Sequence, residues 1–110
     1  MFKIKICGVR QAKDIEAVHA AGADAIGLNF FPPSVRYVDP DASSTLELAK
    51  LAQAAGIRVI GLFVNAPAGD VARVCDRLAL DAAQFHGDEK LEELCELKRQ
   101  LQIPLIRAIK

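Results

Sequence analysis

The sequence predicts an α/β protein whose strands form an all-parallel sheet. Short apolar strand patterns alternate with helical patterns along the 110 residues, in the order β-α-β-α-β-α-β-α-β. Strands separated by single helices pair in parallel through right-handed crossovers, which favours one continuous sheet. The composition agrees, because 52% hydrophobic and 25% charged residues suit one compact domain with a sizeable core. We therefore treat residues 1–110 as a single domain.

The first predicted strand covers residues 2–7 and ends in a thiol. Isoleucines alternate with Lys5 and Cys7, which is the period of a β-strand, and Gly8 predicts a tight turn directly afterwards. The carboxyl ends of parallel strands form the reactive face of α/β proteins. Cys7 therefore occupies a position where chemistry is expected.

The remaining elements follow from apolar residues at strand or helix spacing. The predicted strands cover residues 25–30, 59–64, 82–85 and 105–109, and the predicted helices cover residues 12–21, 41–55, 69–78 and 88–101. Cys75 and Cys95 fall on the apolar stripes of the last two helices, so we expect both in the core. Asp88 and Glu89 are expected at the start of the last helix, where negative charge complements the helix dipole.

An internal echo links the second and third strands. Residues 21–28 align with residues 55–62, and a glycine, Gly27 or Gly61, recurs inside each strand. A glycine within a strand indicates either close approach of another group or a bend of the kind found in barrels. The sequence leaves both explanations open.

Two sheet architectures are compatible with this order of elements. A (β/α)8 barrel needs about 250 residues, so the chain supplies four βα units and a fifth strand, roughly half. An open flavodoxin-type sheet fits the length but normally ends with a helix after strand five. A half-barrel would leave two open sheet edges, which are prone to self-association. We interpret the chain as the front part of something longer.

Charge and cysteine content exclude several functions. The formal net charge is zero, which argues against binding to nucleic acid or to a membrane surface. The three cysteines are widely spaced, so neither a disulfide framework nor a CxxC metal site is predicted. No apolar run approaches the ~20 residues of a membrane span, and no signal-peptide layout opens the chain. We expect reduced thiols and a cytoplasmic protein.

Five motifs stand out along the chain: KIKICGV at residues 3–9, GADAIG at 22–27, FPPSVRYV at 31–38, GLFVN at 61–65 and QFHGDE at 84–89. Together they resemble the motifs of the phosphoribosylanthranilate isomerase family of tryptophan biosynthesis. The resemblance runs from end to end of the chain but covers only the amino-terminal half of the family's (β/α)8 barrel. It implies that the chain forms the first four βα units of that barrel plus strand five.

The resemblance implies an Amadori rearrangement without cofactor or metal. N-(5-phosphoribosyl)anthranilate becomes 1-(2-carboxyphenylamino)-1-deoxyribulose 5-phosphate, which requires one acid and one base. By resemblance Cys7 is the base. The acid is an aspartate on strand six, and the phosphate loops follow strands seven and eight, so both lie outside this chain. We expect the chain alone to be nearly inactive, since losing a general acid costs about 10²–10⁴ in rate.

Lys5 bears on the state of Cys7. It lies two residues earlier on the same strand face, about 6.6 Å back along the strand. Positive charge near a thiol favours the thiolate that a base must be. We therefore expect Lys5 to support Cys7, whereas a free cysteine without the motif would more often be a small buried apolar residue.

The other candidate residues would bind the substrate. Arg36 follows strand two in a loop stiffened by two prolines, and the resemblance assigns it to the substrate, where a guanidinium can grip a carboxylate through two hydrogen bonds. His86 ends strand four and either contacts the substrate or caps a turn. Asn29 and Asn65 end strands two and three and either contact the substrate or satisfy turn backbone groups, the commoner role. Gly8, which follows Cys7, is also predicted to bind the substrate.

Two functions remain from the sequence. The first is an isomerase, complete only when the rest of the barrel is supplied. The second is a non-catalytic half-barrel remnant or self-associating scaffold that keeps the front motifs. Activity of a purified 110-residue monomer would refute the expected inactivity.

Overall fold

The computed structural model describes residues 4–107, and these form five strands and four helices in the predicted order. The elements are β1 (Lys5–Cys7), α1 (Ala12–Ala20), β2 (Ala25–Asn29), α2 (Ser43–Ala54), β3 (Arg58–Phe63), α3 (Ala68–Leu78), β4 (Ala82–Phe85), α4 (Leu91–Gln100) and β5 (Leu105–Arg107). The ends of the predicted first and last strands, residues 2–3 and 108–109, lie outside the described residues.

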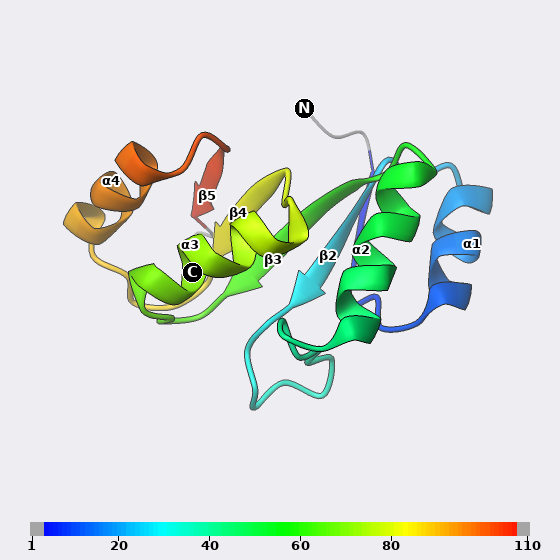
Figure 1. Ribbon diagram of the computed structural model, residues 1–110, viewed down its shortest axis with the longest axis horizontal. Helices are drawn as coiled ribbons and strands as arrows, with labels where there is room; N and C mark the ends of the chain where they lie inside the picture. The colour runs from blue at the N-terminus through cyan, green and yellow to red at the C-terminus, as the bar shows by residue number, and fades with distance from the viewer. Residues whose placement is uncertain (1–3, 108–110) are drawn as a thin grey trace.

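The strands form one parallel sheet in the order β1-β2-β3-β4-β5. A doubly wound sheet reverses its strand order at a switch point, and no reversal occurs here. Figure 1 shows α1 and α2 side by side next to β2, with α4 near β5 at the opposite end. This arrangement is the wall of a barrel, so the half-barrel prediction is confirmed and the open flavodoxin-type alternative is wrong.

One face of the sheet packs against the helices and forms the main core. We call it the outer face. Outward side chains of β2, β3 and β4 join buried apolar residues of all four helices in one cluster. The rings of Phe30, Phe63 and Phe85 lie in a row, with centroid separations of 5.3 and 5.9 Å. Because successive strand residues alternate in direction, the remaining strand side chains point the other way.

The opposite face, which we call the inner face, carries a much smaller apolar cluster and several polar groups. Ala25, Ile60 and Ala82 are buried there, with Ile106 packed against them. The strand register places Cys7 beside Gly27, Gly27 beside Ile60 and Ile60 beside Ala82. The thiol predicted at the end of the first strand therefore belongs to the inner face.

Gly27 and Gly61, the two glycines inside strands, lack a side chain for different structural reasons. A Cβ atom on Gly27 would lie 3.1 Å from the Sγ atom of Cys7, so Gly27 makes room for the thiol on the inner face. A Cβ on Gly61 would lie 2.7 Å from Leu80 and 2.9 Å from the Phe30 ring, so Gly61 permits close packing on the outer face. Close approach accounts for both, one approach on each face.

Two sequence predictions about the last helix are wrong. α4 begins at Leu91 rather than at residue 88, so Asp88 and Glu89 lie in the preceding loop and only later acidic residues occupy its first turn. Cys95 is exposed on α4, whereas Cys75 on α3 is buried as predicted. α4 contributes only Leu94 and Leu97 as buried residues, so its apolar stripe is narrower than the sequence pattern indicated.

Candidate active site at the carboxyl end of the sheet

The inner face opens at the carboxyl ends of the strands into a pocket of about 240 Å³. Five of the six predicted site residues line it, namely Cys7, Gly8, Asn29, Arg36 and His86. They come from three separate stretches of the chain, and the parallel sheet brings them together because it aligns the carboxyl ends of its strands. Asn65 is not among the lining residues.

Cys7 and Gly8 form the turn that leaves β1. The Cys7 side chain is exposed. Gly8 has φ +80°, a backbone conformation that residues with a side chain rarely adopt, and its N–H donates to the Gly27 carbonyl at 3.1 Å. A Cβ on Gly8 would lie 2.6 Å from Cδ of Arg36. The Arg36 stem therefore lies directly over Gly8, beside the thiol.

Side-chain hydrogen bonds hold the loop that carries Arg36. Asn29 accepts the Phe31 N–H at 2.8 Å and donates to the Ser34 hydroxyl at 3.3 Å. The same hydroxyl accepts the backbone N–H of Arg36 at 3.1 Å. Asn29 thus satisfies turn backbone groups, as its type favours, while also lining the pocket.

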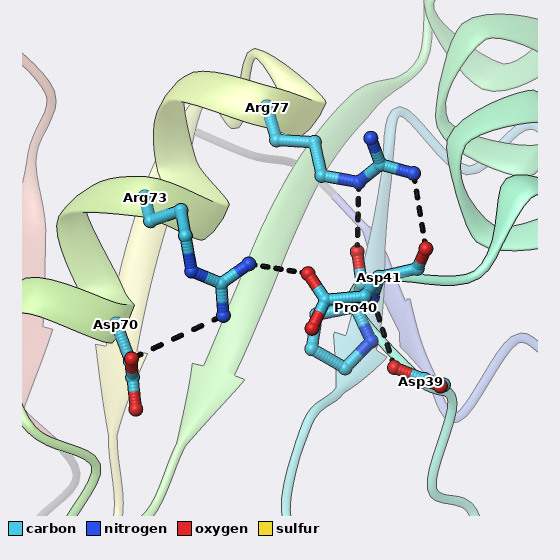
Figure 2. A network of polar contacts seen from close by, with 6 residues as sticks. All are labelled: Asp39, Pro40, Asp41, Asp70, Arg73 and Arg77. Atoms are coloured by element: carbon cyan, nitrogen blue, oxygen red, sulfur yellow. Dashed lines mark hydrogen bonds and ion pairs between the residues drawn. The ribbon is translucent and has the colours of Figure 1, made fainter.

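Two arginines of α3 hold the far end of the same loop (Figure 2). Arg77 donates to the carbonyl oxygens of Pro40 and Asp41 at 3.2 and 3.1 Å, and Arg73 pairs with the Asp41 carboxylate. Arg73 also lies 4.0 Å from Asp70 within its own helix. The loop between β2 and α2 is therefore fixed at both ends.

His86 follows β4, and its ring contacts a residue that sequence reasoning missed. The backbone N–H of His86 donates to the Phe63 carbonyl at 3.0 Å, and its Nε2 lies 2.8 Å from Nε2 of Gln84. Lys5 donates from Nζ to Oε1 of the same Gln84. A polar residue two positions before His86, in an otherwise apolar strand, was the available signal, because alternate strand residues share a face.

Asn65 joins two loops outside the pocket. It has φ +52°, its Oδ1 accepts the Asp88 N–H at 2.8 Å, and its own N–H donates to Glu89 at 2.7 Å. A Cβ on Gly87 would lie 2.4 Å from that Oδ1. Asn65 therefore serves turn backbone groups, the second of its two expected roles.

Glu89 is the carboxylate that the sequence placed at the wrong position. Its side chain is only 5% exposed, and its Oε2 accepts the Asn65 N–H. Because Glu89 precedes α4 and turns inward, it ties the β4–α4 loop to the β3–α3 loop. His86 stands on the first of these loops, three residues earlier.

Other sites were sought among the described residues. Within residues 4–107 no group of three or more His, Cys, Asp or Glu side chains could hold a metal ion. None of the helices formed there has the length and hydropathy needed to cross a bilayer. Burial raises the pKa of the Cys75 thiol to about 11, so this cysteine of the outer core stays protonated at neutral pH.

The sheet order and the pocket define the class of protein: a (β/α)8-barrel protein, with its candidate site at the carboxyl ends of the strands. Residues 4–110 match the family described as N-(5'-phosphoribosyl)anthranilate (PRA) isomerase, and the chain belongs to that family. The resemblance stated from the five motifs is confirmed.

Relatives and solved structures agree. The chain is 48% identical to the N-(5'-phosphoribosyl)anthranilate isomerase of Ralstonia nicotianae, over 98% of this chain and 46% of that protein. Its identity to the same enzyme of Acinetobacter calcoaceticus is 44%, over 97% of this chain and 49% of that protein. The Thermotoga maritima isomerase structure superposes with TM-score 0.82 at 30% identity, covering 99% of this chain and 51% of that one. The chain thus spans about half the length of the relatives it matches.

Proposed function

We propose that this protein, within a complete barrel, catalyses the Amadori rearrangement of N-(5-phosphoribosyl)anthranilate. The observation that carries the proposal is the meeting of Cys7, Arg36 and His86 in one pocket at the carboxyl end of the sheet. A solved isomerase structure with 30% identity is described as a complex with reduced 1-(o-carboxyphenylamino)-1-deoxyribulose 5-phosphate. That compound is a reduced form of the product of the proposed reaction.

Cys7 acts as the base in this proposal. After the furanose ring opens to a Schiff base, the thiolate removes the C2′ proton, and the resulting enolamine tautomerises to the aminoketose. The exposed thiol lies over Gly27, whose lack of a side chain leaves room for the sulfur on the pocket face of the sheet. The Lys5 ammonium lines the same pocket, where it donates to Gln84, and a positive charge near the sulfur stabilises the thiolate that accepts the proton.

Arg36 holds the anthranilate carboxylate. Its guanidinium extends from a loop fixed at both ends, and its stem rests on Gly8 beside Cys7. A planar guanidinium can donate two parallel hydrogen bonds to a carboxylate, which fixes the orientation of the aromatic ring. This grip places the aminosugar carbons over the thiol.

The acid and the phosphate grip come from the part of the barrel beyond strand five. The pocket of about 240 Å³ is smaller than the ~300–1,000 Å³ typical of small-molecule sites, as expected when one side of the wall is supplied elsewhere. In the family's pattern an aspartate on strand six protonates the ring oxygen. The reaction needs both residues, because base and acid act on different atoms.

A fusion protein tests the proposal. Residues 1–110 are joined to the carboxyl-terminal half of the Ralstonia nicotianae relative, and the conversion rate of N-(5-phosphoribosyl)anthranilate is measured. We expect Cys7→Ala to lower the rate by about 10²–10⁴. Cys95→Ala is the matched control, since Cys95 is also an exposed thiol but lies on α4 away from the pocket.

Complementation of a tryptophan auxotroph by the same fusion gives an independent readout. Growth with the unsubstituted fusion and with Cys95→Ala, but not with Cys7→Ala, is the expected pattern. Full activity of the Cys7→Ala fusion would overturn the role of the thiol. An inactive fusion that folds and binds the substrate would overturn the isomerase proposal itself.

A self-associating scaffold is the second candidate, and the sheet edges favour it. Within the described residues β1 and β5 each pair with only one other strand. Unpaired strand edges are templates for pairing with another chain. Sedimentation of the purified chain decides the point, since a concentration-dependent dimer would support the scaffold and a monomer would remove its basis.

A further inference from the structure

Gln84 stands between two side chains of the pocket. Its Oε1 accepts from the Lys5 ammonium, which reaches across the inner face from β1, and its Nε2 lies 2.8 Å from Nε2 of His86. All three residues line the same pocket, and Gln84 is half-buried. The three side chains therefore form a continuous row of hydrogen bonds from β1 to the end of β4.

The hydrogen bonds from Lys5 to Gln84 and from Gln84 to His86 fix the orientation of the Gln84 amide. An ammonium group is a donor only, so Lys5 pairs with the amide oxygen and not with the amide nitrogen. The NH2 group of Gln84 is consequently turned toward His86. Without Lys5 nothing else in the row distinguishes the oxygen from the nitrogen of the amide.

The amide orientation in turn decides the state of the His86 ring. The NH2 group is also a donor only, so Nε2 of His86 must be the acceptor and carries no proton. The single ring proton then resides on Nδ1. A doubly protonated ring would lose the hydrogen bond, because both of its nitrogens are donors.

We propose that Gln84 is a positioning residue that holds His86 as the neutral Nδ1–H tautomer. His86 then offers an N–H group to an acceptor oxygen of the substrate, a carboxylate or a hydroxyl, and does not take a proton from carbon. This inference rests on the proposed function for its meaning, since it separates a donor, His86, from the base, Cys7. The tautomer itself is a property of the chain and is measurable without catalysis.

Nitrogen NMR of the ¹⁵N-histidine-labelled chain tests the tautomer directly. Protonated and unprotonated ring nitrogens have well-separated ¹⁵N chemical shifts, and two-bond couplings to the ring protons assign each nitrogen. The chain contains two histidines, and exposed His19 on α1 serves as the internal reference. We expect Nε2 of His86 to show the unprotonated shift and Nδ1 the protonated one. Protonated Nε2 in the unsubstituted chain would overturn the proposal.

Two substitutions show that Gln84 is the cause. Gln84→Glu keeps the shape but offers only acceptors, so the proton of His86 moves to Nε2. Lys5→Met frees the amide to turn, so both tautomers of His86 are populated. His19 shifts stay unchanged in both variants. An unchanged His86 tautomer in folded Gln84→Glu would overturn the proposal, and if that variant does not fold, the unsubstituted spectrum alone decides.

A kinetic readout in the fusion protein separates positioning from packing. Gln84→Met removes the amide without adding charge beside Lys5, so it is expected to raise KM for the substrate several-fold more than it lowers kcat, since Cys7 and its positive neighbour are kept. Should the fusion prove inactive while the tautomer is as expected, the proposed function fails and the role of Gln84 in fixing the ring stands.

Discussion

The two faces of the sheet are built from the same strands but have different roles. On the outer face, β2, β3 and β4 contribute fully apolar side chains that pack with all four helices in one large cluster. On the inner face, three apolar residues form the buried cluster found within residues 4–107, and Lys5, Cys7 and Gln84 lie on the same face. Neighbouring residues of one strand therefore belong to different environments.

Because of this difference, the outer face mainly stabilises the fold and the inner face forms the candidate site. Apolar burial contributes about 25 cal/mol per Å², so the outer face supplies most of the stabilisation. The inner face holds polar groups that would cost free energy in a sealed core, and it opens into a pocket. Substitutions on the outer face should change the free energy of unfolding, and substitutions on the inner face should change the site.

The largest contrast is expected between Phe85 and Gln84, neighbours on β4. Phe85 is 2% exposed and stacks on Phe63, so Phe85→Ala should lower the free energy of unfolding by about 3–5 kcal/mol. Gln84→Ala removes hydrogen bonds of a half-buried side chain and should cost about 1 kcal/mol. Urea unfolding of the 110-residue chain measures both. Equal losses would mean that the two faces stabilise the fold alike.

The two strand glycines give the next contrast. Gly61→Ala would place a Cβ 2.7 Å from Leu80 and 2.9 Å from Phe30, which overpacks the outer face at a cost of about 1–3 kcal/mol. Gly27→Ala meets only the Cys7 thiol closely, at 3.1 Å, and should leave the free energy of unfolding nearly unchanged.

The Gly27 variant should act on the thiol. The added methyl group displaces or covers the Cys7 sulfur, so its alkylation should slow while that of exposed Cys95 stays constant. Mass spectrometry of the alkylated peptides measures both rates in one sample. A slower Cys7 reaction in Gly61→Ala but not in Gly27→Ala would contradict the assignment of the two glycines to the two faces.

Cys75 provides a pH-dependent contrast on the outer face. Burial raises its pKa from 9.0 to about 11, so between these values the folded chain keeps a thiol proton that the unfolded chain loses. The folded state then binds more protons, and the free energy of unfolding falls as pH rises from about 9 to 11. The loss is at most on the order of 3 kcal/mol, given a pKa difference of about two and about 1.4 kcal/mol per pKa unit.

Other groups titrate in the same range, so the measured quantity is a difference. Unfolding free energies of the unsubstituted chain and of Cys75→Ala are followed across this pH range. The slope should be steeper in the unsubstituted chain. Parallel curves would show that the Cys75 thiol ionises equally in both states.

The sequence was sufficient to predict the architecture because its signals were local. Strand alternation, helical spacing and the glycines after α1 and α2 each depend on neighbouring residues, and all nine elements lie where they were expected to within a few residues. The start of α4 was misplaced because Asp88 and Glu89 look like helix-start carboxylates. Glu89 instead turns inward to accept the Asn65 N–H, a contact between residues 24 positions apart.

The candidate site was predictable in position but not in its connections. Cys7, Arg36 and His86 follow from strand ends and from the resemblance, and they meet in the pocket. The link from Lys5 to Gln84 joins residues 79 positions apart and depends on how the sheet curves. Likewise, no pattern marks Cys95 as exposed, because exposure depends on what packs against that side of α4.

The smallest effects are expected from the α3 arginines that hold the Arg36 loop. Arg77 donates to two backbone carbonyls, and removing it leaves both without this donor, so Arg77→Ala should cost about 1 kcal/mol. Arg73 pairs with Asp41 at a surface where the two side chains are 49% and 57% exposed, so Arg73→Ala should cost less, about 0.5 kcal/mol. Urea unfolding at low and high salt measures both.

Salt distinguishes the two arginines. Exposed ion pairs are screened within a Debye length of about 10 Å at 0.1 M salt, so the effect of Arg73→Ala should vanish as salt rises. The effect of Arg77→Ala should persist, because its partners are neutral carbonyl groups of the loop backbone. Arg77→Lys keeps the charge but cannot bridge Pro40 and Asp41 as a planar guanidinium does, so it should resemble Arg77→Ala. If Arg77→Lys behaves like the unsubstituted chain, charge alone holds the loop and its geometry does not depend on the bridge.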